Sequence, residues 1–222
     1  MKKILAFLTA VLLAVPAFAQ DDHVIVSSKD GVVSLETVSH MGWGYHFVKS
    51  DDFKRAGSGQ FFINLLNLGI RPAEAFGIGL GADFKFDYIG SRKDSFKLDA
   101  DKKVQALPFP DTYDKTRSEI NVTSLSFPLL AKVYFGDWHV SLGAEADLNL
   151  WGHTYNFTKE ANVRTRVTER KAKLETFSYG LIAAIQHNDF GIFCKYYPKS
   201  SKILPDGSVD FSYWTLGVAF GL

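Results

Sequence analysis

The chain has 222 residues, with 25 Lys and Arg against 24 Asp and Glu, and its one cysteine is Cys194. Because the net charge is close to zero, bulk attraction to nucleic acid or another polyanion is excluded, and no nucleic-acid partner is expected. A single cysteine excludes an internal disulfide, so no covalent staple accounts for the stability of the chain. The length suits one domain, for which 19 phenylalanines supply ample apolar surface.

The first twenty residues, "MKKILAFLTAVLLAVPAFAQ", have the features of a secretory signal peptide. Lys2 and Lys3 precede an apolar run, and Ala17-Phe18-Ala19 is a small-x-small cleavage site. The run is too short to span roughly 30 Å of hydrocarbon, which argues against a membrane anchor. We therefore predict a cleaved signal peptide at 1–19. Residues 20–40, which are polar with short β-branched runs, are predicted to form a periplasmic leader that partly extends the first strand.

Strict alternation of apolar and polar residues predicts strands in the rest of the chain. From Phe76 to Tyr88 every second residue is apolar, and the residues between are glycines, aspartates and a lysine. A period of two indicates β-strand rather than helix. The alternation recurs along the chain, and further strands are placed in the gaps between its clearest segments. Together they predict eight strands, at 41–48, 59–68, 76–90, 122–135, 138–151, 174–187, 190–197 and 208–221.

The predicted connections between these strands alternate between long and short. Residues 91–121 and 152–173 are long loops, whereas 136–137 and 187–189 are tight turns. Long loops on one side and tight turns on the other are typical of outer-membrane barrels, whose turns face the periplasm. Pro128 conflicts with a regular fourth strand because proline cannot donate to the ladder, so a bulge is expected there or a strand that begins just after it.

The position of the glycines favours a membrane barrel over a soluble one. A lipocalin-type barrel would place the apolar face inside, whereas a membrane barrel turns it towards lipid. Gly77, Gly79 and Gly81 lie on the polar face, where a narrow interior needs small residues. Aromatic residues lie near the strand ends, as in the girdles at bilayer interfaces. Residues 41–222 are therefore predicted to form one transmembrane β-barrel.

The signal peptide, the eight alternating segments and the ending "TLGVAFGL" together resemble the outer-membrane β-barrel domain family called PorT-like, which is similar to small OmpA/OmpX-type barrels. The resemblance covers essentially the whole mature chain and implies an all-β, eight-stranded, antiparallel up-and-down barrel in the outer membrane, most simply a monomer. The ending resembles an assembly signal read by the barrel-assembly machinery, with Thr215, Gly217, Phe220 and Leu222 at the matching positions, although the commonest form ends in Phe. Membership of the family does not specify a function.

Charged residues collect on the face that is predicted to line the interior. They are Asp83, Lys85, Asp87, Lys132, His139, Glu145, Asp147 and Lys195. Charges in so narrow a barrel are costly unless they are paired. Because an eight-stranded interior is just wide enough for its own side chains, a closed network is favoured over a narrow solute or ion pore.

A lipid A-modifying enzyme is a second alternative. Small outer-membrane acylases and deacylases use Ser, His and an acid near the outer leaflet, and His153, Glu175 and Ser178 have matching types and rough heights. No local motif supports this reading of the three residues, so we predict no catalytic residues. No metal site or cofactor is expected, because no spacing of potential ligands resembles one. Cys194 has lipid-facing parity and is expected to be inert.

The long loops are the remaining candidates for interaction. The loop at 152–173 is basic, with Lys159, Arg164, Arg166, Arg170, Lys171 and Lys173, and could bind lipopolysaccharide phosphates or simply be a solvated loop. The loop at 91–121 combines mixed charges with "LPFPDTYDK" and fits contact with lipid or an unknown protein partner. The leading prediction is therefore a structural or interaction role for an outer-membrane protein, without catalysis.

Overall fold

The computed structural model describes residues 24–28, 31–35, 40–73, 75–161 and 163–221. The predicted signal peptide at 1–19 and the terminal Leu222 lie outside these residues. All the regular elements that the structure describes are β-strands. No helix among the described residues is long and apolar enough to cross a membrane.

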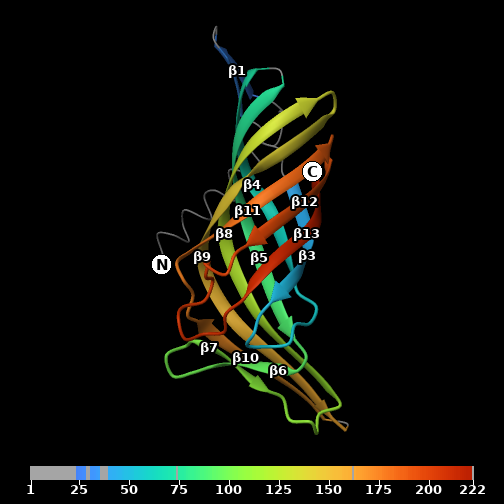
Figure 1. Ribbon diagram of the computed structural model, residues 1–222, viewed down its shortest axis with the longest axis vertical. Helices are drawn as coiled ribbons and strands as arrows, with labels where there is room; N and C mark the ends of the chain where they lie inside the picture. Colours follow the sequence, from blue (N-terminus) through green and yellow to red (C-terminus); the bar gives the residue numbers. More distant parts are fainter. Residues whose placement is uncertain (1–23, 29–30, 36–39, 74, 162, 222) are drawn as a thin grey trace.

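Eight strands form a closed antiparallel barrel (Figure 1). They are β3 (His40–Lys49), β4 (Gly59–Ala73), β5 (Phe76–Ser91), β8 (Lys115–Phe135), β9 (Trp138–Glu160), β11 (Phe177–His187), β12 (Phe190–Tyr197) and β13 (Ser212–Gly221). Each pairs with the next along the chain, and β13 pairs with β3, which closes the ring. Closure leaves no sheet edge unpaired around the ring, as a hydrocarbon environment requires. The predicted all-β, eight-stranded up-and-down barrel is confirmed.

The barrel has an apolar exterior and a polar interior. On β3, exposed Trp43, Tyr45 and Phe47 alternate with buried Gly44 and His46, and the other ring strands show the same alternation. Contiguous apolar surface of this extent is rare on proteins that face water. The facing is therefore that of a transmembrane barrel, in which lipid solvates the outer surface.

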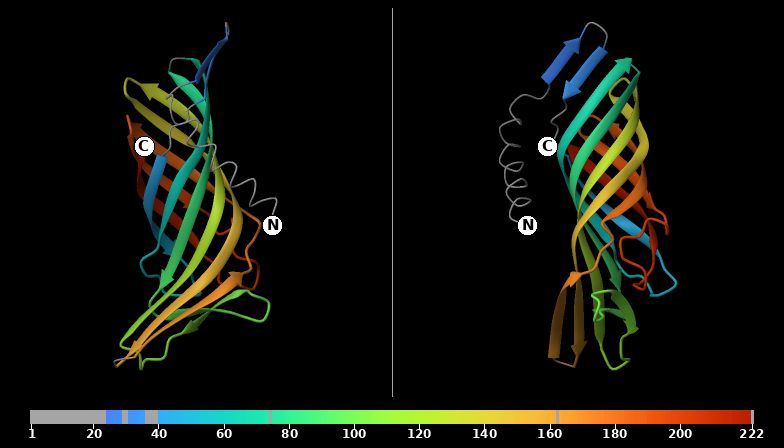
Figure 2. Two further views of the ribbon diagram at one scale, coloured as in Figure 1. Left: turned by 180° about the vertical axis from the view of Figure 1, so that it is seen from behind. Right: turned by 90° about the vertical axis from the view of Figure 1, so that its left-hand side faces the viewer.

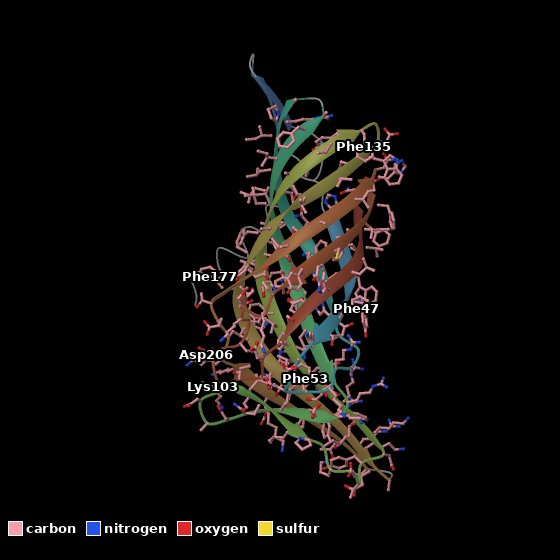
Figure 3. The ribbon with its side chains drawn as sticks, in the orientation of Figure 1. Phe47, Phe53, Lys103, Phe135, Phe177 and Asp206 are labelled. Carbon is pink, nitrogen blue, oxygen red and sulfur yellow. The ribbon has the colours of Figure 1, made fainter. Side chains whose placement is uncertain are left out.

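Tight turns gather at one end of the barrel, here called the turn end, and long connections gather at the other, the loop end. The turns at Gly136-Asp137 and Asn188-Asp189 have their first residues in the left-handed region, with φ of 61° and 48°. Exposed aromatic side chains mark two levels of the exterior, and in Figure 3 Phe135 lies near the turn end while Phe47 and Phe177 lie about midway along the molecule. Such levels are typical of aromatic girdles.

The two long loops contain strands that the alternation did not reveal. The prediction of a loop at 152–173 was wrong, because β9 continues to Glu160 and β10 (Val163–Ala172) pairs back along it. The other long connection contains a hairpin of β6 (Asp94–Leu98) and β7 (Val104–Pro108). In the right-hand view of Figure 2 both hairpins project from the loop end, and hydrogen bonds such as the one from Leu98 N to Glu169 Oε2 join them.

Pro128 causes no bulge, so that prediction was also wrong. It pairs with Glu145 in regular register, and the β5–β8 register is the same on both sides of it. Its ring lies over Gly81, where a Cβ would be 2.9 Å from the proline Cγ. Glycine on the neighbouring strand thus provides the space that the proline needs. The register of β8 against β9 shifts instead between Thr123 and Ser124, where Leu150 of β9 is the extra residue.

The described part of the predicted leader forms a further hairpin, of β1 (Val24–Ser28) and β2 (Gly31–Leu35). β2 pairs with the end of β4, where Val33 lies opposite Ile70. In Figure 1 this hairpin extends beyond the turn end of the barrel.

Candidate functional site

Lys85 lies at the centre of a charged cluster inside the barrel. Its Nζ lies 2.5 Å from Asp147 Oδ2, 3.4 Å from Asp87 Oδ2 and 2.5 Å from the Tyr197 hydroxyl. The lysine and both carboxylates are almost completely buried. These contacts come from β5, β9 and β12, so one ammonium group links strands from different parts of the barrel wall.

A second ion pair adjoins the first. Lys195 Nζ donates to Glu145 Oε2 at 2.7 Å, and Ser126 Oγ donates to the same oxygen at 3.2 Å. The Tyr197 hydroxyl donates to the other Glu145 oxygen while it accepts from Lys85. Tyr197 therefore joins the two ion pairs into one hydrogen-bonded network.

His46 extends this network to the strands at which the ring closes. Its Nδ1 lies 2.8 Å from Thr215 Oγ1 and its Nε2 lies 3.1 Å from Asp87 Oδ1. Its ring packs on Tyr213 with a centroid distance of 4.5 Å. Parity in the sequence places His46, Tyr197 and Tyr213 on the interior face, but alternation does not show which interior side chains meet one another.

The remaining predicted interior residues lie closer to the turn end. Asp83 accepts from Asn64 Nδ2 at 2.6 Å. Together with Lys195, Lys132 and His139 it lines a small cavity of about 110 Å³. The eight predicted residues therefore divide between a central network and this cavity, and Lys195 and Asp83 lie where the two meet.

The deeply buried charges do not balance. Among the described residues, four deeply buried carboxylates, those of Asp83, Asp87, Glu145 and Asp147, accompany two deeply buried ammonium groups, those of Lys85 and Lys195. Several buried polar atoms also lack a hydrogen-bond partner within the described structure: both amide atoms of Gln60, Asp87 Oδ2, Asp147 Oδ1 and the Tyr213 hydroxyl. Unbalanced charge in a low-dielectric interior is costly, so removal of either lysine should be strongly destabilising.

An apolar cluster, here called the cap, covers the network on the loop side. Its members come from the ends of the ring strands nearest the loop end and from the loops. They are Val48, Phe53, Ile89, Phe96, Val104, Ile120, Val122, Ala172, Tyr197, Ile203, Leu204, Val209, Phe211 and Tyr213. The rings of Phe53 and Phe96 meet edge to face at 4.9 Å. Apart from the hydroxyls of Tyr197 and Tyr213, its side chains are apolar, so the cluster offers few groups that could solvate a passing ion.

Hydrogen bonds between loops hold the cap in place. Val209 N donates to Val104 O at 2.9 Å, and Gln105 Nε2 donates to Gly207 O at 2.7 Å. Figure 3 shows Lys103 and Asp206 at this junction on the outside of the loop end. A hydrogen bond from Lys202 and its charge lower the pKa of Asp206, but both groups are fully exposed, so this pair adds little to stability.

The outward face of the β8–β9–β10 sheet is strongly basic. Successive side chains of a strand alternate between faces, so residues that pair across the strands share one face. One cross-strand row is Arg164–Lys159–Lys115, and the next row towards the barrel is Arg166–Phe157–Arg117. Two further rows, Thr168–Tyr155–Glu119 and Arg170–His153–Asn121, continue to Trp151 on the lipid-facing exterior.

This surface, here called the basic face, comprises Lys115, Arg117, Lys159, Arg164, Arg166 and Arg170. The one acid in its four rows is Glu119, which pairs with Arg117. A hollow of about 650 Å³ lies over part of the face, with Tyr155 and Phe157 in its lining. Four of the six predicted loop cations lie on the face. Of the others, Lys171 is the extra residue of a β-bulge and Lys173 lies beyond the end of β10.

The candidate catalytic residues are not brought together. His153 lies on the outward face of β9, whereas Ser178 is buried inside the barrel, where it contacts Asn149 at 3.3 Å and Asp147 at 3.5 Å. Glu175 lies in the segment between β10 and β11, and its backbone carbonyl accepts from Asn149. Among the described residues, no group of three or more His, Cys, Asp or Glu side chains could hold a metal ion.

The predicted assembly signal lies on the closing strand, β13. Thr215 is buried against His46, and Gly217 lies so close to Trp43 O that a Cβ would be 2.4 Å from it. Phe220 is exposed on the exterior and contacts Phe190. Cys194, on neighbouring β12, is half-buried and pairs with Leu216.

No protein-family model matches the chain, and no curated protein matches it either. Among solved structures, it is similar to the attachment invasion locus protein Ail of Yersinia pestis, alone and in complex with the heparin analogue sucrose octasulfate. In both cases the identity is 15%, the TM-score is 0.39, and the match covers 83% of this chain and 97% of Ail. Neisserial surface protein A matches with 9% identity and a TM-score of 0.37, over 83% of this chain and 96% of that protein. Likenesses this distant say nothing about a ligand of this chain.

Proposed function

We propose that this protein is a monomeric, non-conducting outer-membrane barrel that binds lipopolysaccharide through its basic face. The observation that carries the proposal is the row Arg164–Lys159–Lys115, in which three cations are direct cross-strand neighbours. Like charges directly opposite one another destabilise a sheet. A bound anion would relieve this repulsion, and arginine in particular favours phosphate.

The position of the basic face favours a glycolipid over a free polyanion. On the turn-end side of its rows, the lipid-facing exterior carries an aromatic group of Trp151, Phe84 and Phe86. The ring centroids of Trp151 and Phe84 are 6.0 Å apart. A molecule whose phosphates lie towards the loop end and whose acyl chains lie along the lipid-facing exterior would contact the basic face and the aromatic group at once.

The proposed cellular setting follows from the sequence. The predicted signal peptide, the ending of β13 and the PorT-like pattern support export, insertion by the barrel-assembly machinery and residence in the outer membrane. In that orientation the turn end faces the periplasm and the loop end faces the outside. The separation of His153 from Ser178 gives no support to a lipid-modifying activity, so the role is one of structure or interaction.

Neutralising the outermost cation row should weaken lipopolysaccharide binding by about tenfold or more, since exposed ion pairs contribute about 0.2–1 kcal/mol each and more where they form networks. The variant is Lys115→Gln with Lys159→Gln and Arg164→Gln. Binding can be measured as the lipopolysaccharide-dependent rise in the unfolding temperature of protein folded in detergent.

A matched control removes three lysines elsewhere at the loop end: Lys97→Gln with Lys102→Gln and Lys103→Gln. The control should bind as the wild type does, and dephosphorylated lipopolysaccharide should stabilise neither protein. Equal losses in the two triple variants would contradict a specific basic face and leave only general charge attraction.

Planar bilayers that contain the folded protein should show no discrete conductance steps. The cap covers the loop side of the lumen with packed apolar side chains, and the side chains of the charged network fill the lumen on the turn side of the cap. A porin in the same bilayer serves as the positive control. Discrete, ion-selective steps from the wild-type protein would sink the non-conducting proposal and revive the pore alternative.

A further inference from the structure

The two faces of the β8–β9–β10 sheet differ in both charge and shape. The outward face is the basic face. The side chains of β9 and β10 on the opposite face form one wall of a groove of about 370 Å³, and the other wall is the segment from Leu107 to Tyr113. A cavity of this volume suits a small molecule rather than the surface of a protein.

The wall formed by residues 107–113 is apolar and aromatic. It consists of Leu107, Pro108, Phe109, Pro110 and Tyr113. The Phe109 and Tyr113 rings meet edge to face with a centroid distance of 6.2 Å, and the two prolines stiffen the backbone that holds them. Leu107 remains 48% exposed, so this wall presents apolar surface that nothing in the described chain covers.

The wall formed by β9 and β10 carries hydrogen-bonding groups. Thr158 and Thr165 are direct cross-strand partners, and neither hydroxyl has a side-chain hydrogen bond within the described residues. Glu169 uses Oε2 to accept from Leu98 N at 2.8 Å and from Thr154, and its Oε1 makes no such bond there. Hydroxyl and carboxylate groups therefore face the aromatic wall across the groove.

The charges of the groove cancel. Lys97 and Glu169 are its two charged lining residues, one of each sign. The basic face on the other side of the same sheet has a large excess of positive charge. A neutral ligand therefore suits the groove, whereas an anionic ligand suits the basic face.

The geometry points to a binding site for a neutral saccharide of one or two rings in this groove. A sugar ring has an apolar C–H face that can pack on Phe109 and Tyr113, and hydroxyls at its edge that can bond with Thr158, Thr165 and Glu169. A proline-rich or apolar peptide would pack on the wall formed by residues 107–113 but would leave those polar groups without hydrogen-bond partners, which costs affinity. This site is separate from the basic face and does not rest on the proposed binding of lipopolysaccharide.

Saturation-transfer difference NMR on the full chain, folded in detergent, tests the site. The probes are lactose, cellobiose and N,N′-diacetylchitobiose, with glucose 6-phosphate as an anionic comparison. At least one neutral disaccharide should receive saturation, strongest at the C–H protons of one ring face. Absence of transfer to all three disaccharides, or equal transfer to glucose 6-phosphate, would overturn the proposal.

Matched variants locate the binding. Thr165→Val should weaken disaccharide binding by about threefold to tenfold, which corresponds to the loss of one neutral hydrogen bond. Thr168→Val, on the same strand but on the basic face, should change nothing. Tyr113→Ala should abolish transfer, whereas the triple basic-face variant should retain it. If Thr165→Val and Thr168→Val behave alike, or if Tyr113→Ala still binds, the groove is not the site.

Discussion

Replacing Lys85 by methionine should destabilise the folded barrel by about 3–5 kcal/mol, the usual cost of leaving a buried charge without its partner. The substitution keeps an unbranched side chain of nearly the same length but removes the ammonium that contacts Asp87 and Asp147. It also raises the excess of buried carboxylates over ammonium groups. Urea-induced unfolding from lipid vesicles, followed by tryptophan fluorescence and by gel mobility without heating, gives the free energy of unfolding.

Two double variants distinguish local pairing from net charge. Lys85→Met with Asp147→Asn and Lys85→Met with Asp83→Asn carry the same net charge. Only the first removes a carboxylate that Lys85 contacts, because Asp83 bonds to Asn64 instead. The first should therefore recover about 1–3 kcal/mol more stability than the second. Equal recovery in both would mean that the excess charge alone matters, and a loss below about 1 kcal/mol in Lys85→Met would contradict the central role of this lysine.

The strand arrangement could be predicted because lipid outside and a polar lumen inside impose opposite chemistry on successive residues. Where this contrast ends, the prediction fails. Beyond Trp151 both faces of β9 and β10 are polar, so alternation disappears although Thr, Tyr, Phe and Val still favour a strand. For the same reason β8 begins at Lys115, seven residues before its predicted start, and Lys115 and Arg117 were missed as part of the basic face.

The interior charges could be selected by parity, but their pairing could not. Which acid meets which lysine depends on the register and tilt of strands that are distant in the sequence, as in the contact between Lys85 and Asp147. The cap was missed for a different reason. Phe53, Phe96 and Ile203 lie in segments predicted as loops, and buried apolar residues there were the available sign that the loops fold back over the lumen.

Gly143→Ala should destabilise the barrel by about 3 kcal/mol or more, or prevent its assembly, because backbone must move to admit one methyl group. A Cβ at Gly143 would lie 1.9 Å from Leu129 O and 2.9 Å from Leu129 C, on the neighbouring strand β8. Backbone on a paired strand cannot yield as the end of a flexible side chain can. The measurement is the fraction of protein that migrates as the compact, heat-modifiable form after refolding, followed by urea unfolding of any folded fraction.

Gly191→Ala is the matched control for this effect, since Gly191 also lies in a ring strand and is buried. The nearest atom to a Cβ there is Ile185 O at 3.4 Å, an ordinary contact distance. Loss of glycine flexibility in the unfolded chain stabilises by about 0.4–1 kcal/mol where the backbone permits alanine. Gly191→Ala should therefore fold as well as the wild type. The close approach of β8 and β9 at Gly143 depends on the absence of a side chain there. This approach lets Pro128, Glu145 and the charged network share one narrow lumen. A Gly143→Ala protein that is as stable as Gly191→Ala would refute it.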